Sequence, residues 1–340
     1  MKVAIGSKYI DKPWGGGNLF IKNLTEYLVQ NNVETVLHLG HKDIDTILLF
    51  DPRKDSKYAT FNHEDINYYK KYVNENVKVV HRINECDERK NTTGVNKFYI
   101  NANKCADHTV FVSEWLQKIY LNQDFNNNNS VIKAGANRDI FNTKNRSNLN
   151  DSNYIKIVTH HWGNNWNKGF ETYKLIDELV GTEINGKKIK FSYIGNLPKN
   201  FRFENTEHIS PLSGEDLAKE LKKYHIYVTG SLNEPSGNHH IEAAQCGLPL
   251  LYINSGGIPE YCDGFGVPFE EYNFVEKLNK IINKYDYFFE KILEYENNSE
   301  KMSQEFLELF NDLNGSFRPK KLKISNYYFL NKQKAKYYLI

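Results

Sequence analysis

The chain has 340 residues, of which 40% are hydrophobic and 25% are charged, and its formal net charge at pH 7 is +2. This length and composition predict two globular domains and exclude a disordered chain, and the nearly balanced charge gives no reason to expect a nucleic-acid partner. No apolar run could span a membrane, the first residues lack a signal-peptide core, and the four cysteines lack disulfide or zinc spacing. We therefore expect a cytoplasmic protein.

In the first half of the chain, short apolar runs alternate with amphipathic segments. The run "KVAIGS" predicts a first strand, and "NLFIKNLTEYLVQN" shows helical periodicity after a glycine-rich loop. Further buried strands are predicted at "TILLF", "VKVVHRI", "HTVFVS" and "SVIKAG". This alternation is typical of a parallel sheet with helices on both faces. We assign residues 1–145 to one Rossmann-like domain.

A polar stretch, "NTKNRSNLNDSN" at residues 142–153, interrupts the alternation and predicts an exposed linker, which we place at 146–153. Strands and helices then resume, from "YIKIVTHH" through "KIKFSYIGN" and "IYVTGS" to "PLLYIN". We assign residues 154–315 to a second Rossmann-like domain. The predicted fold class is therefore α/β, with two doubly wound domains.

Residues 316–340 form a basic and aromatic tail that includes "RPKKLKISNYYFLNKQKAKYYLI". One interpretation is a strand or helix that packs back on the body of the protein. The alternative is a peripheral contact with the anionic inner face of a membrane, in which aromatic side chains lie at interfacial depth. The basic residues of that contact would be Lys320, Lys321, Lys323, Lys332, Lys334 and Lys336.

The loop after "IYVTGS" is predicted to lie at the functional rim of the second sheet, because ligands of open α/β sheets bind beyond the carboxyl ends of the strands. It contains Glu234, and Ser236 or Asn238 can cap the following helix, whose exposed amides form an anion site. Gly237 permits a ligand to approach the backbone closely. Glu242, inside this helix, is expected to face the same cleft.

The segment "SLNEPSGNHHIEAAQCGLPLLYINSGGIPE" resembles the carboxy-terminal half-site of retaining GT-B glycosyltransferases, particularly family 4 (glycosyl transferases group 1). It carries the Glu-x7-Glu, Gly-x-Pro and Gly-Gly-x-Pro-Glu motifs of that family. Two glutamates at this spacing are weak evidence alone, but the ordered set of motifs favours function. The resemblance implies a GT-B fold, with Glu234 on the donor sugar and Glu242 on the ribose hydroxyls. A carboxylate beside the anomeric carbon would stabilise an oxocarbenium-like transition state.

Lys168, followed by Gly169 in "HHWGNNWNKGF", occupies the position of a Lys-Gly pair in this family. Its ammonium would neutralise the donor diphosphate and the leaving group. An arginine that commonly lies about a turn before this lysine is absent from the chain. The resemblance therefore implies either that His161 or Asn164 substitutes for it or that the phosphate is held less tightly.

Two segments of the first half resemble the acceptor side of the same family. In "WGGGNLFIKNL", Gly15, Gly16 and Gly17 permit close approach of donor phosphate or acceptor, although a plain flexible loop is the alternative because no dinucleotide fingerprint is present. In "VVHRINECDERK", His81 is predicted to orient an acceptor hydroxyl or the sugar, and Arg82 to contact phosphate. A structural histidine is the alternative.

A metal site is disfavoured. The histidine pairs 160–161 and 239–240 are adjacent residues, so each pair offers at most one well-directed ligand. Asp43 and Asp45 resemble a metal-binding Asp-x-Asp, but they precede the strand "TILLF" instead of following one. No metal or other cofactor is expected.

These features together predict a glycosyltransferase that moves a sugar from a UDP- or GDP-sugar to an acceptor, with retention of configuration. The acceptor would be a glycan, a lipid-linked molecule or another glycoconjugate, and the product would enter cell-surface glycan synthesis. Two alternatives remain open from the sequence. One is a nucleotide-sugar epimerase of the same fold, and the other is a non-catalytic nucleotide-sugar-binding module, which the absent arginine favours.

Overall fold

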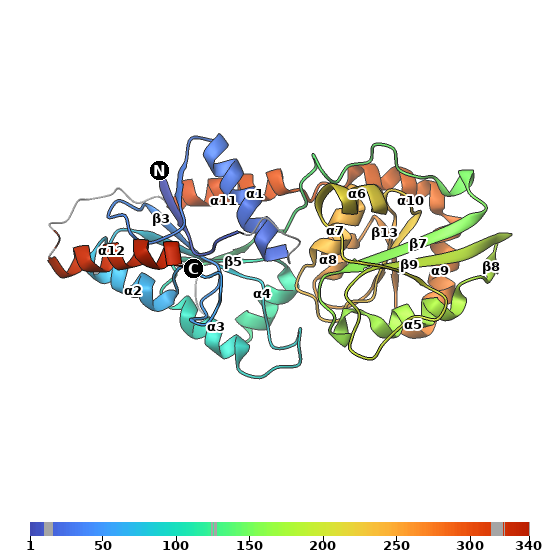
Figure 1. The fold of residues 1–340 in the computed structure, drawn as a ribbon, viewed down its shortest axis with the longest axis horizontal. Helices are drawn as coiled ribbons and strands as arrows, with labels where there is room; N and C mark the ends of the chain where they lie inside the picture. The colour runs from blue at the N-terminus through green and yellow to red at the C-terminus, as the bar shows by residue number, and fades with distance from the viewer. Residues whose placement is uncertain (10–15, 124, 126–127, 314–321, 323, 340) are drawn as a thin grey trace.

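Each half of the chain is organised around its own parallel sheet (Figure 1). The computed structural model describes residues 1–9, 16–123, 125, 128–313, 322 and 324–339. Within them, the predicted α/β fold with two Rossmann-like domains is confirmed. The N-terminal sheet has the order β2-β1-β3-β4-β5-β6, formed by Lys2–Ile5 (β1), Glu34–Val36 (β2), Thr46–Leu49 (β3), Lys78–Ile83 (β4), His108–Phe111 (β5) and Asn129–Val131 (β6).

The C-terminal sheet has the order β10-β9-β7-β11-β12-β13, and β8 is paired with β9 in the antiparallel sense. Its central strands are short apolar runs, which is the pattern of strands buried on both faces. The strands are Tyr154–His161 (β7), Glu183–Ile184 (β8), Lys187–Gly195 (β9), Glu207–Ile209 (β10), Ile226–Thr229 (β11), Leu250–Ile253 (β12) and Gly266–Phe269 (β13).

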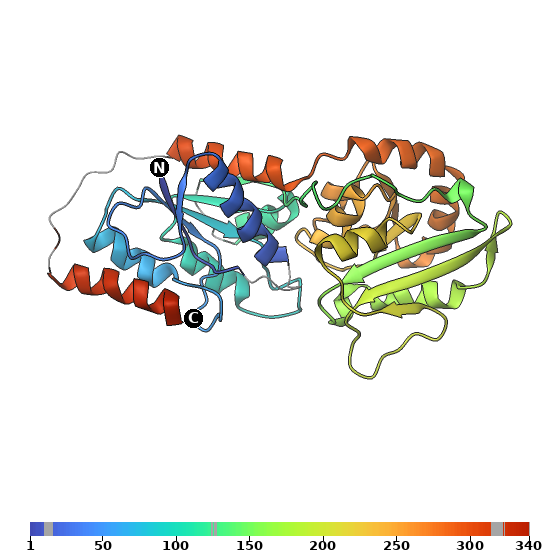
Figure 2. The ribbon, with the colours of Figure 1, turned by 45° about the horizontal axis from the view of Figure 1, so that its top comes forward.

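Helices cover both faces of each sheet (Figures 1 and 2). In the N-terminal domain they are Gly16–Gln30 (α1), His63–Tyr72 (α2), Val95–Asn103 (α3) and Glu114–Leu121 (α4). The C-terminal half contains Phe170–Leu179 (α5), Gly214–Leu221 (α6), Asn238–Gln245 (α7), Ile258–Cys262 (α8), Phe274–Asn283 (α9), Tyr285–Lys291 (α10), Ser299–Leu313 (α11) and Ile324–Leu339 (α12). In the described part of the chain, no helix has both the length and the apolar character of a membrane span.

Helix α11 belongs to the N-terminal core, whereas the predicted boundary at residue 315 placed it in the C-terminal domain. Its buried side chains Met302, Phe306 and Phe310 join the apolar cluster formed by α1 and one face of the N-terminal sheet. The ring of Phe306 meets that of Phe20 edge-on, with centroids 5.3 Å apart. The sequence shows that this helix has an apolar stripe but not which domain covers it.

The chain crosses between the domains twice, and the two crossings lie side by side. The backbone N–H of Ser299 donates a hydrogen bond to the carbonyl of Ala136 at 2.8 Å, and Ala136 forms a β-bridge with Asn298. A Cβ on Gly135 would lie 2.1 Å from the Asn298 backbone, so only glycine fits there. The stretch predicted as an exposed linker is also anchored, because Leu149 is buried in the C-terminal core.

The described part of the predicted tail forms α12, which lies along α2 of the N-terminal domain (Figures 1 and 2). Leu330 is buried there, and the rings of Phe329 and Tyr68 stack at 4.4 Å. The amide of Gln333 donates to the Asp65 carboxylate at 2.8 Å. The predicted membrane residues Lys320, Lys321 and Lys323 lie outside the described residues.

Truncation of Phe306 tests the packing of α11 on α1. We expect Phe306→Ala to lower the free energy of unfolding by about 3–5 kcal/mol, because the substitution leaves a cavity in the N-terminal core. Urea denaturation followed by circular dichroism measures this change. The exposed Gln304 lies on the same helix, and Gln304→Ala should change stability by less than about 0.5 kcal/mol. Equal effects of the two substitutions would contradict the assignment of α11.

Candidate functional site

A cavity of about 1020 Å³ lies between the two domains. Its N-terminal wall is formed by the first turn of α1 and by residues at or after the carboxyl ends of β3 and β4. Its C-terminal wall is formed by the loop after β7 and by the loop from β11 into α7. Both walls are therefore at the sheet edges where ligands of α/β folds bind.

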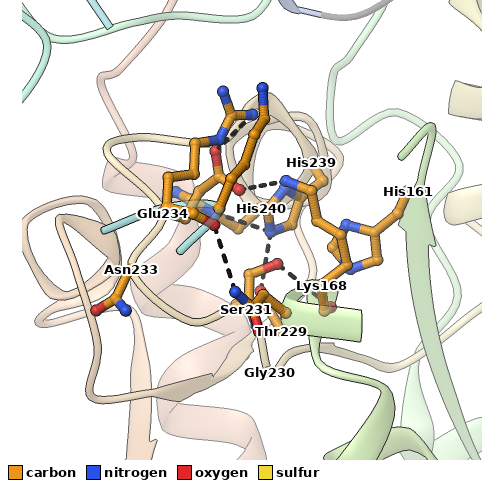
Figure 3. A network of polar contacts seen from close by, with 12 residues as sticks. His161, Lys168, Thr229, Gly230, Ser231, Asn233, Glu234, His239 and His240 are labelled. Carbon is orange, nitrogen blue, oxygen red and sulfur yellow. Dashed lines mark hydrogen bonds and ion pairs between the residues drawn. The ribbon is translucent and has the colours of Figure 1, made fainter. Parts of the chain in front are cut away.

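A buried carboxylate, that of Glu234, is held by one cation from each domain. Glu234 follows β11 and is only 4% exposed. Lys168, at the end of the short 3-10 helix Trp166–Lys168, donates from Nζ to Glu234 Oε2, and the two side chains point toward one another (Figure 3). On the other side, Nη2 of Arg89 lies 3.2 Å from Glu234 Oε1.

The two cations keep Glu234 ionised. Burial alone would raise the pKa of this carboxyl. The charges of Arg89 and Lys168 lower it by more than burial raises it, and the resulting pKa is about 2. Burial lowers the pKa of Lys168, although Glu234 opposes the shift. The structure thus brings together Glu234 and Lys168, as the family resemblance implied, in a site that carries a fixed negative charge between two positive ones.

Arg89 was not identified from the sequence. It lies in the loop after β4, in the opposite domain, and its own backbone carbonyl accepts a hydrogen bond from Asn167 at 3.5 Å. The backbone carbonyl of the neighbouring residue Glu88 accepts a hydrogen bond from the side-chain amide of Asn233 at 3.3 Å. The loop is shaped by Asp87, whose carboxylate accepts hydrogen bonds from three backbone amides at the start of α3. No local sequence pattern indicates that this loop reaches across the cleft.

The two residues predicted to replace the absent arginine differ in their position relative to the cavity. His161 lines the cavity, but burial lowers its pKa well below the ordinary value, so its ring is neutral. Its Nε2 lies 2.6 Å from the Tyr173 hydroxyl, which holds the ring in the C-terminal core. Asn164 is exposed and donates to the Leu197 carbonyl at 3.3 Å. It is not among the residues that line the cavity.

Glu242 faces the cavity from α7, as predicted, and has a partner that the sequence did not indicate. Its Oε2 lies 2.9 Å from Nε2 of His160, and both side chains are buried. His160 thereby fixes the orientation of Glu242 toward the cleft.

Helix α7 begins without a side-chain cap, which corrects the prediction that Ser236 or Asn238 caps it. The N-cap is Gly237, with φ of +85°, and among the described residues no side chain accepts a hydrogen bond from the first-turn amides. A Cβ on Gly237 would lie 2.7 Å from the His239 ring, so the position requires glycine. All three predicted residues, 236–238, line the cavity. The uncapped amides are therefore available to an anion.

The glycine loop of the N-terminal domain meets α7 across the cavity. A Cβ on Gly16 would lie 2.7 Å from the Asn238 side chain, and one on Gly17 would lie 2.8 Å from the Phe50 ring. The structure thus brings together the predicted residues Gly16 and Asn238, one from each domain. Gly15 lies outside the described residues.

His81 does not line the cavity, and its predicted catalytic role is not supported by its position. Its side chain is fully buried, and Nδ1 lies 2.8 Å from the Asn103 amide oxygen. Burial lowers its pKa to about 4. Side chains alternate along a strand, so the neighbouring Arg82 points the other way and lines the cavity.

The Gly-Gly-x-Pro-Glu motif joins the domains. The carboxylate of Glu260 accepts hydrogen bonds from the backbone amides of Glu114 and Trp115, both at 2.7 Å, and so caps α4. The next residue, Tyr261, donates its hydroxyl to the Val112 carbonyl and accepts from the Ala134 amide. Among the described residues, no group of three His, Cys, Asp or Glu side chains could hold a metal ion.

Part of the chain is similar in sequence to known glycosyltransferases. Residues 183–302 match the family model described as Glycosyl transferases group 1. A curated relative is the phosphatidylinositol N-acetylglucosaminyltransferase gpi3 subunit of Schizosaccharomyces pombe, 26% identical over 133 residues, which are 35% of this chain and 29% of that protein. The match therefore spans less than a third of that relative.

Solved structures show the same two-domain arrangement. Sucrose-phosphate synthase from Thermosynechococcus elongatus has a TM-score of 0.64 at 15% identity and covers 92% of this chain and 99% of its own. HepE from Anabaena, in complex with UDP-glucose, has a TM-score of 0.65 at 13% identity and covers 92% and 100%. The fold is that of the GT-B glycosyltransferases. With the group 1 match over the C-terminal domain, these findings support a glycosyltransferase.

The ion pairs of Glu234 make stability depend on pH. Its pKa in the folded protein is about 2 and its ordinary value is 4.5, so its contribution is complete above about pH 4.5 and is lost as the pH falls toward 2. We expect the free energy of unfolding of the wild type to fall between pH 5.5 and 3.5 by about 1 kcal/mol more than that of Glu234→Gln. Urea titrations at the two pH values measure the difference. Parallel pH profiles would contradict the charged environment of Glu234.

Proposed function

We propose that this protein is a retaining glycosyltransferase that transfers a sugar from a UDP-sugar to an acceptor bound in the interdomain cleft, without a divalent metal. The observation that carries the proposal is the buried Glu234 carboxylate, held by Lys168 and Arg89 beside the uncapped start of α7. The group 1 match over residues 183–302 supports the same reaction class. UDP is proposed because the structure of HepE contains UDP-glucose, and that of TarM from S. aureus contains UDP.

The donor diphosphate would bind at the start of α7, where the amides around Gly237 and Asn238 have no side-chain cap within the described part of the chain. Lys168 would neutralise the leaving phosphate. Arg89, reaching from the other domain, would supply the second cation that the family has next to that lysine. Glu242, oriented by His160, would accept hydrogen bonds from the ribose hydroxyls. Protein cations and helix amides would thus carry the role that a metal has in other transferases.

In the reaction, the acceptor hydroxyl oxygen would bond to the anomeric carbon as the bond from that carbon to the phosphate oxygen breaks. The proton of the hydroxyl would pass to the departing phosphate oxygen on the same face of the sugar. Glu234 would hold the sugar hydroxyls and stabilise the positive charge that develops on the ring. The carboxylates of Asp51 and Glu85 also line the cavity, but each is paired with an arginine, so neither is free to act as a nucleophile.

We place this activity in the synthesis of cell-surface glycans or glycoconjugates, on the cytoplasmic side of the membrane. The names of two relatives support a glycoconjugate acceptor: a phosphatidylinositol N-acetylglucosaminyltransferase subunit and a pneumococcal O-GlcNAc transferase. The anomeric configuration of the product, read by nuclear magnetic resonance, tests retention. An inverted product would overturn that part of the proposal.

A panel of nucleotides tests the donor class. We expect UDP, but not ADP or CDP, to raise the melting temperature, because a ligand at about 100 times its dissociation constant adds about 2.7 kcal/mol of stability. GDP tests the alternative donor. The shift should be the same with EDTA, since no metal is needed. Stabilisation by none of the nucleotides would favour a non-catalytic protein with a decayed site, and a shift abolished by EDTA would contradict the metal-free mechanism.

Substitutions of the two glutamates should separate binding from turnover. We expect Glu242→Ala to weaken UDP binding about tenfold or more, because a charge-assisted hydrogen bond to ribose is lost. Glu234→Gln should leave UDP affinity within a few-fold of wild type and lower the rate of donor hydrolysis at least about a hundredfold. Calorimetry and a hydrolysis assay measure the two quantities. The matched control is Glu271→Ala, which removes an exposed carboxylate later in the chain. It should change neither the affinity for UDP nor the rate of donor hydrolysis.

A further inference from the structure

On the N-terminal wall of the cleft, Arg82 is a buried cation with no counter-ion among the described residues. Its side chain is 4% exposed, and among the described residues neither Nε nor Nη1 has a hydrogen-bond partner. The other arginines of this wall are engaged, since Arg53 is held by Asp51 and Arg89 by Glu234 and Glu85. Among the arginines that the structure describes on this wall, Arg82 is therefore the one without an ion pair.

Aromatic rings compensate only part of this charge. The guanidinium lies 4.0 Å from the centroid of Phe20 and 5.6 Å from that of Phe50. Such contacts contribute less free energy than the burial of an unpaired ion costs. Burial lowers the pKa of Arg82 to about 10, so the group is still charged at neutral pH. A buried charge of this kind is stabilised when an anion binds to it.

The first turn of α1 provides a second anion-attracting feature at the same place. Phe20 belongs to α1 and packs on Arg82, and Gly17 lies against Phe50, so the start of the helix and the guanidinium converge on one part of the cavity. The first turn contains no acidic residue that would occupy the positive end of the helix. Helix amides and an arginine fork together match the geometry of a phosphate group.

We propose that Arg82 and the first turn of α1 bind a phosphate group of the acceptor, so that the acceptor is a phosphorylated molecule and not a neutral glycan. The inference rests on the proposed function, which assigns the phosphates of the donor to α7, Lys168 and Arg89. The donor diphosphate thus already has two cations and a helix start. Arg82 projects from β4 on the opposite wall of the cleft. The phosphate belongs either to a soluble molecule or to a lipid headgroup.

Binding of a simple phosphate probe to the full chain tests the site. With UDP saturating, we expect the wild type to bind glycerol 3-phosphate but not glycerol, as measured by calorimetry. Arg82→Met keeps an apolar side chain on Phe20. It should weaken binding of glycerol 3-phosphate about tenfold or more and leave the affinity for UDP within twofold of wild type. Arg53→Met removes an arginine of the same wall that is already paired, and should change neither affinity.

Vesicle binding tests whether the phosphate belongs to a lipid headgroup. The vesicles contain phosphatidylcholine with and without phosphatidylglycerol. Arg82-dependent binding to the anionic vesicles alone would assign the phosphate to a lipid, and binding of the soluble probe would assign it to a small molecule. Either result supports the site. Equal binding of both probes to wild type and Arg82→Met, or no binding by wild type, would overturn it.

Two further results separate the site from the proposed function. A loss of UDP affinity in Arg82→Met, with the probe unaffected, would show that Arg82 holds the donor phosphate and would overturn the inference. If UDP does not bind the wild type, the proposed function fails, and titration of the probe without nucleotide still tests Arg82. Should Arg82→Met not fold, Arg82→Lys keeps the charge but loses the two-pronged contact, and should weaken the probe about three- to tenfold. Wild-type affinity in that variant would contradict the proposal.

Discussion

The arrangement of the cleft depends on the burial of one ionised carboxylate, that of Glu234. A charge removed from water is tolerated only where opposite charges and hydrogen bonds replace the lost solvation. Lys168 supplies one of these charges from the same domain and Arg89 supplies the other from across the cleft. The requirement to neutralise Glu234 therefore fixes more than one side chain. It connects the loop after β4 to the C-terminal domain across the cleft.

Neighbouring features support the same frame. Glu260 caps a helix of the opposite domain, and Tyr261 bridges two of its backbone groups. The residues that end the group 1-like motif thus contact the opposite domain, while those at its start form the rim of the cleft. One continuous stretch of sequence places the ligand-binding loop and sets its distance from the other domain. This explains physically why these motifs occur together and in this order.

Much of the fold was predictable, because buried parallel strands appear in sequence as short apolar runs. The convergence of Lys168, Glu234 and Glu242 was also predicted, from resemblance and from the edge of the sheet to which their loops belong. The burial of His81 away from the cavity was not predictable, because every residue of β4 after Lys78 is buried and the sequence does not show which alternate positions face the cleft. Arg89 and α11 were missed because their partners are distant in sequence. A loop's reach and the domain that covers an apolar stripe are set only by tertiary packing.

The paired crossings at Ala136 and Ser299 have a mechanical consequence. Because both termini of the described chain belong to the N-terminal domain, the C-terminal domain is attached at two points, like an insertion. The β-bridge between Ala136 and Asn298 and the hydrogen bond from Ser299 to Ala136 hold the two crossings side by side, so a relative movement of the domains must bend both crossings together. Neither domain can be separated by a single cut, since residues 1–131 alone would lack the helix that completes their core.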